Sequence, residues 1–183
     1  DWPAARIAWT RALEARATRA QVYYQMGLAA RAGGDPLAAR SDFERALAET
    51  PPAPGAAKEL AAMALAEGRG ADARLLLERY IREAGPDPET LATLAVVLAN
   101  AGDGEGATRT IREARALLPE GWHRAELEAQ IFARAGDAAA TVAALRPLQE
   151  EGRLDRGALR ADPAYVPIAT DPANMGRRAP MRS

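Results

Sequence analysis

The sequence contains no cysteine, a single lysine (Lys58), a single histidine (His123) and only two serines, Ser41 and Ser183. Without cysteine, these residues form no disulfide, no thiolate metal site and no thiol nucleophile. One histidine leaves a zinc site short of its usual three or four protein ligands. The two serines fall inside an expected helix and at the last residue, so a serine–histidine–acid triad is not expected. We therefore expect no enzyme activity, no metal and no cofactor.

The chain also has no strong net charge of either sign. The net charge is −1 over 183 residues, with 48% hydrophobic and 27% charged residues, which is the composition of a folded chain. No overall basic field is available to hold nucleic acid or an anionic membrane. Apolar runs such as 94–99 and 60–66 fall far short of the roughly 18 residues of a membrane span. We expect no nucleic-acid partner and no membrane insertion in this segment, and the compartment stays open between cytoplasm and periplasm.

Four glycines stand 34 residues apart, at Gly34, Gly68, Gly102 and Gly136. A period of 34 residues is typical of a solenoid of helix–turn–helix units. Other columns keep the same register, with small and large residues spaced so that they share one helical face. The small column is Ala5, Ala39, Ala73, Ala107 and Thr141, and the large one is Trp9, Phe43, Leu77, Ile111 and Leu145. Prolines interrupt the chain between units, since proline cannot continue a helix.

The unit over residues 20–51 resembles the tetratricopeptide repeat, with Tyr23, Met26, Gly27, Ala39, Phe43, Ala46 and Pro51 in the family's signature columns. The resemblance covers roughly residues 1–151. It implies an all-α fold of a bacterial protein: a right-handed α-solenoid of antiparallel helix pairs with a 34-residue period, plus a short C-terminal capping segment. Its expected segments are the second helix of an incomplete repeat (1–17), repeats at 20–53, 54–87, 88–121 and 122–153, a cap (154–172) and a basic tail (173–183).

Three positions depart from the repeat pattern. Tyr80 replaces the usual alanine, Gly85 replaces the terminal proline, and Glu128 stands in an apolar column. We interpret Glu128 as the mark of a degenerate terminal repeat that faces water. After Glu151 the period stops, and the two Asp-Pro pairs that follow suit the starts of short helices that fold back on the last repeat.

In tetratricopeptide arrays the first helix of each unit lines a concave groove, which accepts a peptide or a helix of another protein. The matching columns predict a groove that is apolar in the middle and polar at both ends. Its expected lining is Gln21, Tyr24, Leu28, Arg31, Lys58, Ala62, Leu65, Glu89, Val96, Asn100, His123, Glu126, Gln130 and Arg134, with Gly55, Ala92, Ala99 and Ala133 in the same columns. The carboxylate clamp of heat-shock co-chaperones is absent, because its columns carry Tyr24 and Leu28 in one unit and Glu89 and Thr93 in another.

These features favour a module that binds a segment of a partner protein or holds an assembly together. Two alternatives stay open. One is an accessory repeat domain of a larger enzyme or of a secretion or envelope protein, because the sequence opens in mid-repeat and we expect the preceding helix to lie upstream. The other is a homo-oligomerisation module, because the incomplete first repeat carries Trp2 and Trp9.

Overall fold

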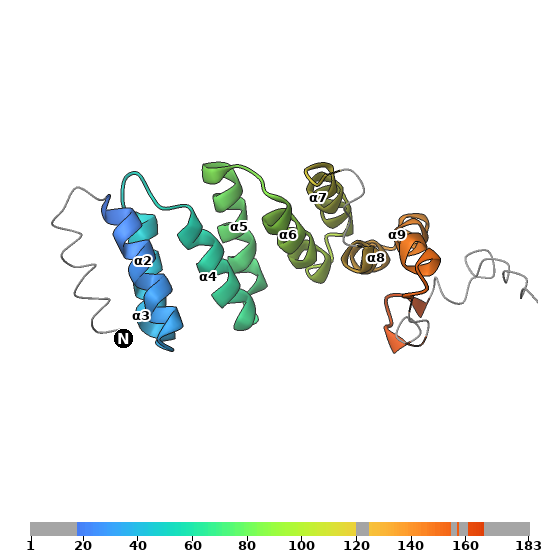
Figure 1. Ribbon diagram of the computed structural model, residues 1–183, viewed down its shortest axis with the longest axis horizontal. Coiled ribbons are helices and arrows are strands. Elements are labelled where there is room, and N and C mark those ends of the chain that lie inside the picture. The colour runs from blue at the N-terminus through green and yellow to red at the C-terminus, as the bar shows by residue number, and fades with distance from the viewer. Residues whose placement is uncertain (1–17, 120–124, 155–156, 158–160, 167–183) are drawn as a thin grey trace, which may run out of the picture. The chain divides into compact units, whose positions relative to one another are not determined.

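The computed structural model describes residues 18–119, 125–154, 157 and 161–166. Over these residues the secondary structure is helical and contains no strand, so the all-α expectation is confirmed. The helices are α2 (Arg19–Ala32), α3 (Pro36–Ala48), α4 (Gly55–Ala66), α5 (Gly70–Ala84), α6 (Pro88–Asn100), α7 (Gly104–Ala116), α8 (Ala125–Arg134) and α9 (Ala138–Glu150), as Figure 1 shows. His123 and the expected segments 1–17 and 173–183 lie outside the described residues. No helix in the described ranges is long and apolar enough to cross a membrane.

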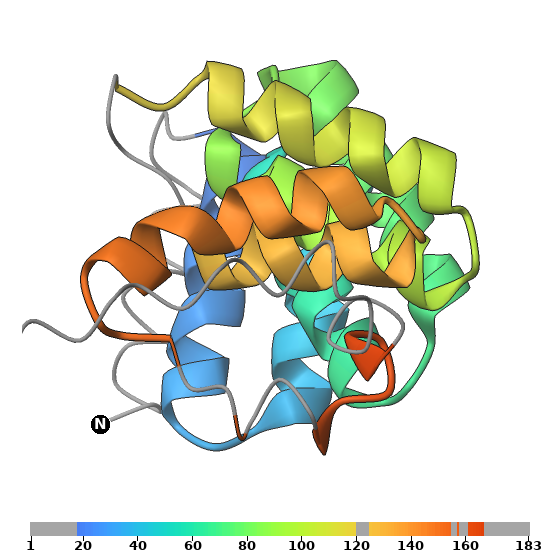
Figure 2. The same ribbon diagram turned by 90° about the vertical axis from the view of Figure 1, so that its right-hand side faces the viewer.

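The chain divides into two compact units, residues 1–90 and 91–183. In the first unit α2 packs against α3, α3 against α4, and α4 against α5. In the second unit α7 packs against α8 and α8 against α9; Figure 2 shows α8 and α9 side by side. Helices that follow one another after short turns and pack as neighbours are consistent with a helical repeat.

The turn after each of four helices has one geometry. Gly34, Gly68, Gly102 and Gly136 all have a left-handed backbone, with φ between 73° and 82°. The residue after each glycine donates its backbone N–H to a carbonyl five residues back, over 2.8–3.0 Å. This six-to-one hydrogen bond is the Schellman closure of a helix, and glycine adopts the required φ without steric cost. The glycine column therefore ends α2, α4, α6 and α8 in the same way.

Aspartates that follow three of these glycines begin the next helix. The Asp35 carboxylate accepts a hydrogen bond from the N–H of Ala38, and Asp103 and Asp137 accept equivalent bonds from residues three further on, all over 2.8–3.0 Å. A carboxylate in this place satisfies a backbone donor that the helix itself leaves unpaired. Gly-Asp is thus a complete stop-and-start signal, and α3 packs back against α2 and α9 against α8.

The core of the first unit is built around Phe43, which is completely buried among small residues. A β-carbon on Gly27 of α2 would lie only 2.5 Å from two ring carbons of Phe43 in α3. The absence of a side chain at Gly27 therefore lets the two helices approach closely over the ring. Tyr24 adds a second ring, with its centroid 6.0 Å from that of Phe43.

Glu128 of the second unit does not face water, so the expectation from the sequence is wrong at this position. Glu128 is only 2% exposed and lies in the core of α8 beside Ala129, Ile131 and Phe132. Its carboxylate accepts a hydrogen bond from Arg115 of α7 over 3.3 Å. A buried carboxylate is tolerated where a cation and hydrogen bonds replace the lost water. The acidic residue in the apolar column is thus a point of attachment between α7 and α8.

Gly27→Ala should destabilise the chain, although alanine favours helix by about 1 kcal/mol over glycine. Its methyl group would collide with the fully buried ring of Phe43, and overpacking of this kind costs about 1–3 kcal/mol. Gly70→Ala is the matched control, because nothing lies within 4 Å of a β-carbon there. Urea denaturation followed by circular dichroism should show a lower free energy of unfolding for Gly27→Ala alone. Equal stabilities for the two variants would contradict the packing described.

Arg115→Ala should lower the free energy of unfolding by about 1–3 kcal/mol, because it takes a charged hydrogen-bond partner from a buried carboxylate. Adding Glu128→Gln to that variant should recover part of the loss, since a neutral amide is less costly to bury. Arg153→Ala is the control: the side chains of Arg153 and Glu151 are 65% and 51% exposed, so the change should cost about 0.5 kcal/mol or less. Thermal unfolding of the three variants tests this, and equal losses from Arg115→Ala and Arg153→Ala would refute it.

Candidate functional site

The expected groove residues of the first unit lie on the solvent-accessible faces of α2 and α4 and at the start of α6. Those on α2 recur every three or four residues and so share one face. Five of the eight are exposed and three are half-buried: the exposed ones are Gln21, Arg31, Ala62, Leu65 and Glu89, and the half-buried ones are Tyr24, Leu28 and Lys58. We call this set the α2–α4 face. Every member is accessible to a ligand.

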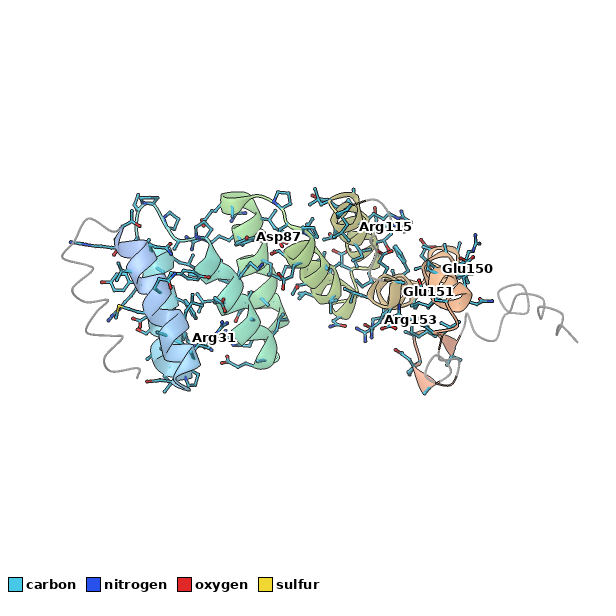
Figure 3. The ribbon with its side chains drawn as sticks, viewed as in Figure 1. Arg31, Asp87, Arg115, Glu150, Glu151 and Arg153 are labelled. Atoms are coloured by element: carbon cyan, nitrogen blue, oxygen red, sulfur yellow. The ribbon has the colours of Figure 1, made fainter. Side chains whose placement is uncertain are left out.

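Charged contacts connect the helices that carry the α2–α4 face. Arg31 of α2 forms an ion pair with Glu59 of α4. Figure 3 shows Arg31 on the last turn of α2. Lys58 of α4 lies 3.4 Å from the carboxylate of Glu89 and 3.8 Å from that of Asp87. The structure therefore brings polar side chains from all three helices into one row of spatial neighbours.

Tyr24 fits beside Gly55 of the next helix. A β-carbon on Gly55 would lie 3.0 Å from the Tyr24 ring, so the glycine makes room for it. Burial raises the pKa of Tyr24, and the carboxylate of Glu59 raises it further against the opposing effect of Arg31 and Lys58. The Tyr24 hydroxyl is thus a neutral hydrogen-bonding group among charges of both signs.

Lys58 is held charged by its surroundings. Burial alone would lower the pKa of its ammonium group, but Asp87 and Glu89 outweigh burial and leave the pKa above its ordinary value. The ammonium nitrogen also lies 5.3 Å from the centroid of the Tyr80 ring, within the range of a cation–π interaction. The only lysine of the sequence is therefore fixed in place by two carboxylates and one aromatic ring.

In the second unit the expected residues divide between α6 and α8. Val96 and Gln130 are half-buried, whereas Asn100, Glu126 and Arg134 are exposed. Arg134 of α8 donates a hydrogen bond to the side-chain oxygen of Asn100 in α6, which joins the two helices. The alanines Ala92, Ala99 and Ala133 of the same columns are buried, so they contribute to packing and not to an accessible surface.

Three residues that take part in these contacts of the first unit were not predicted from the sequence. Glu59 is the partner of Arg31, Asp87 is a partner of Lys58, and the Tyr80 ring lies against the Lys58 ammonium group. The sequence does single out Tyr80, because it stands in a column where the other repeats have alanine or leucine. It does not single out Glu59 and Asp87, because their roles depend on how α2, α4 and the chain before α6 approach one another.

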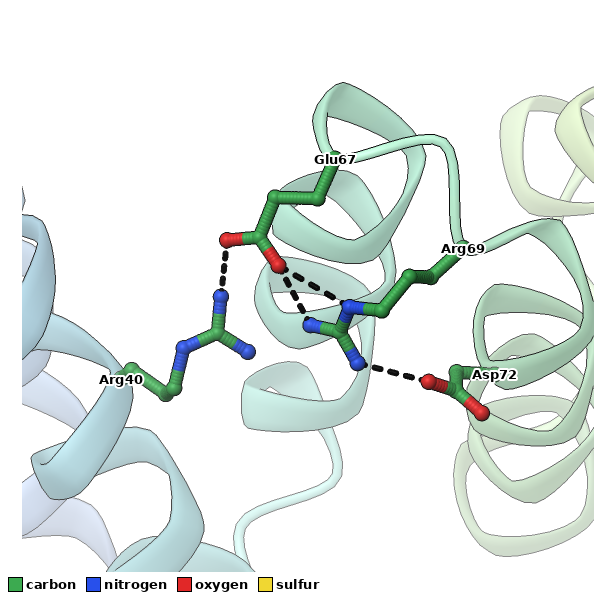
Figure 4. Close-up of polar contacts among 4 residues, drawn as sticks. All are labelled: Arg40, Glu67, Arg69 and Asp72. Carbon is green, nitrogen blue, oxygen red and sulfur yellow. Dashed lines mark hydrogen bonds and ion pairs between the residues drawn. The ribbon is translucent and has the colours of Figure 1, made fainter.

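A second accessible surface of the first unit lies between α3 and α5, around a hollow of about 480 Å³. Its lining includes Leu47, Leu75 and three arginines. Figure 4 shows that Glu67 binds both Arg40 and Arg69, and that Arg69 also reaches Asp72 over 2.6 Å. The third arginine, at position 79, donates to the backbone carbonyl of Leu47 and to Glu83. Each guanidinium group of this α3–α5 surface is therefore engaged by an acceptor of the chain itself.

Metal-binding groups and similarity to known proteins were both sought for this chain. In the part of the chain that the structure describes, no group of three or more histidine or acidic side chains is arranged to hold a metal ion. No protein-family model matches the chain, and no curated protein matches it in sequence. The site has to be interpreted from its own chemistry.

The Asp87 carboxylate should make the stability of the chain sensitive to acid. Burial alone would raise its pKa, but hydrogen bonds from Thr90 and the charge of Lys58 hold the pKa below its ordinary value of about 4. A lowered folded-state pKa means that the stabilisation is present above about pH 4 and is lost as the pH falls through the folded-state value.

Asp87→Asn keeps one acceptor oxygen for the backbone N–H of Thr90, and it removes the charge and the second oxygen, which accepts from the Thr90 hydroxyl. Urea denaturation should show a variant less stable by about 0.5–1 kcal/mol at pH 7, with the difference shrinking below pH 4. Asp72→Asn, at a 52% exposed side chain, serves as the control. A difference for Asp87→Asn that is constant from pH 7 to pH 3 would contradict this assignment.

Proposed function

We propose that the chain is a tetratricopeptide-type, right-handed α-solenoid with a 34-residue period, which binds a segment of a partner protein along the α2–α4 face. One observation carries the proposal. The expected groove residues of α2 and α4 are accessible, and their polar groups are ordered by contacts between helices, from Arg31 with Glu59 to Lys58 with Glu89. A surface whose side chains are already fixed loses less entropy when it binds.

The chemistry of the α2–α4 face indicates what kind of segment fits it. Leu28, Ala62 and Leu65 supply apolar area, and Leu65 is 37% exposed. Around them stand carboxylates and cations in ion pairs, together with the neutral amide of Gln21 and the hydroxyl of Tyr24. A partner segment with apolar side chains against the leucines and polar groups of both signs at its margins would be complementary. A uniformly charged ligand would not, because the face carries both signs.

The α3–α5 surface supplies the contrast. It is accessible as well, and Leu75 there is 65% exposed, but its arginines are engaged by acceptors of the chain. It also lies on the second helix of each pair, whereas the resemblance to tetratricopeptide arrays places ligand contacts on the first. Changes on this surface therefore provide a matched control for changes on the α2–α4 face.

Affinity capture with the 183-residue chain, read by mass spectrometry, tests the proposal. The groove variant carries Gln21→Ala, Lys58→Ala and Leu65→Ala, all at accessible positions of the α2–α4 face. We expect it to retain a specific partner at least about tenfold more weakly than the unchanged chain, since a tenfold loss needs only about 1.4 kcal/mol. Circular dichroism checks that helix content is unchanged.

Glu44, Asp72 and Leu75 line the hollow of the α3–α5 surface. The control variant carries Glu44→Ala, Asp72→Ala and Leu75→Ala and should retain the partner at the original level. If the control variant loses the partner while the groove variant keeps it, the α3–α5 surface is the binding site and the proposal is wrong. The same conclusion follows if neither variant affects the capture of a partner that binds the unchanged chain.

A further inference from the structure

Tyr24 of α2 is held in place by two neighbouring helices. Its ring centroid lies 6.0 Å from that of Phe43 in α3, with the two rings tilted by 46°. The carbon that bears its hydroxyl and the hydroxyl oxygen lie 3.0 and 3.1 Å from the place of a β-carbon on Gly55, the first residue of α4. The phenol is therefore fixed between α3 and α4, so little side-chain entropy is lost when it binds a ligand.

The Tyr24 hydroxyl is not used by the described part of the chain. It forms no hydrogen bond there, whereas no fully buried side-chain oxygen or nitrogen of the described residues lacks a hydrogen-bond partner. The oxygen of Tyr24 is therefore in contact with solvent. Burial of the side chain raises the pKa of Tyr24, so the hydroxyl keeps its proton at neutral pH and can donate a hydrogen bond.

The charged groups beside this hydroxyl are engaged with one another. Lys58 and Glu59 stand three and four residues after Gly55 on α4, about one helical turn from the place where the Tyr24 ring meets that helix. Glu59 forms an ion pair with Arg31, and Lys58 is held by two carboxylates. A charged ligand group would have to break one of these contacts to be neutralised, whereas a neutral group would not. The position therefore suits a neutral hydrogen-bond acceptor.

We propose that the Tyr24 hydroxyl donates a hydrogen bond to a main-chain carbonyl of the partner segment, which binds in an extended conformation. An extended segment leaves its carbonyl groups unpaired, whereas a helix uses them internally. Leu28 stands one turn further along α2, or about 6 Å, which is roughly two residues of an extended chain. A segment with an apolar side chain against Leu28 therefore carries its main chain past Tyr24. This inference rests on the proposed binding function and adds the conformation of the ligand and the group that recognises it.

The test uses a synthetic ligand. A phage-displayed library of random peptides is selected on the 183-residue chain, and peptides that also bind the groove variant are removed. A remaining peptide is synthesised, and its dissociation constants are measured by isothermal titration calorimetry. Tyr24→Phe keeps the ring and removes only the hydroxyl. We expect this variant to bind the peptide about threefold to tenfold more weakly than the unchanged chain, which is the usual contribution of one neutral hydrogen bond.

Tyr23→Phe is the matched control. Tyr23 is also half-buried on α2, but the guanidinium carbon of Arg45 in α3 lies 5.7 Å from its ring centroid, which places the Tyr23 ring beside α3. This variant should bind the peptide as tightly as the unchanged chain. Urea denaturation should give the same free energy of unfolding for Tyr24→Phe and the unchanged chain, because the hydroxyl has no partner in the described chain to lose. A fall in the stability of Tyr24→Phe would make the hydroxyl a structural group and overturn the inference.

Ester substitution in the peptide identifies the acceptor. Each main-chain amide is replaced in turn by an ester, whose carbonyl accepts hydrogen bonds more weakly. At one position the ester should weaken binding to the unchanged chain and leave binding to Tyr24→Phe unaffected, because the two changes remove the same interaction. Esters with equal effects on the two chains at every position would contradict the assignment. A peptide that NMR shows to be helical when bound would contradict it as well.

The outcomes separate this inference from the proposed function. If the groove variant loses the peptide while Tyr24→Phe and Tyr23→Phe bind it equally, the α2–α4 face binds ligands and only the role of Tyr24 is wrong. If no selected peptide distinguishes the unchanged chain from the groove variant, both the proposed function and this inference fail.

Discussion

The glycine turn is the constraint on which the rest of this structure depends. At four places a left-handed glycine ends one helix, and the next residue closes the turn with a hydrogen bond five residues back. The direction in which the following helix returns is therefore set by the backbone itself. Where an aspartate follows, its carboxylate starts that helix at once. The signals that end one helix and begin the next are local to the turn. Other side chains are therefore free to differ from one helix pair to the next, and these side chains determine the surface chemistry.

Differences between units then decide what each surface is able to do. In the first unit, Gly27 admits the Phe43 ring and Gly55 admits Tyr24, so two positions without side chains shape both the core and the α2–α4 face. Ion pairs between helices hold that face in order. In the second unit, Glu128 joins α8 to α7 from within the core.

Periodicity in the sequence predicted the helices, the glycine turns and the accessible columns on α2 and α4, because spacing along a helix determines which residues share a face. It did not predict the burial of Glu128, since a lone carboxylate in an apolar column shows no sign of its partner Arg115. It also missed the roles of Glu59 and Asp87, which depend on contacts between segments. Ala92, Ala99 and Ala133 fell in the right columns and yet are buried.

Site-specific photocrosslinking tests the central claim most directly. A benzophenone side chain is placed at Ala62, an exposed position of the α2–α4 face, or at Leu75, which is 65% exposed on the α3–α5 surface. With the partner retained in affinity capture, the account predicts a covalent adduct from position 62 and none from position 75. An adduct from position 75 alone would contradict it, because ligand binding would then take place on the second helices of the pairs.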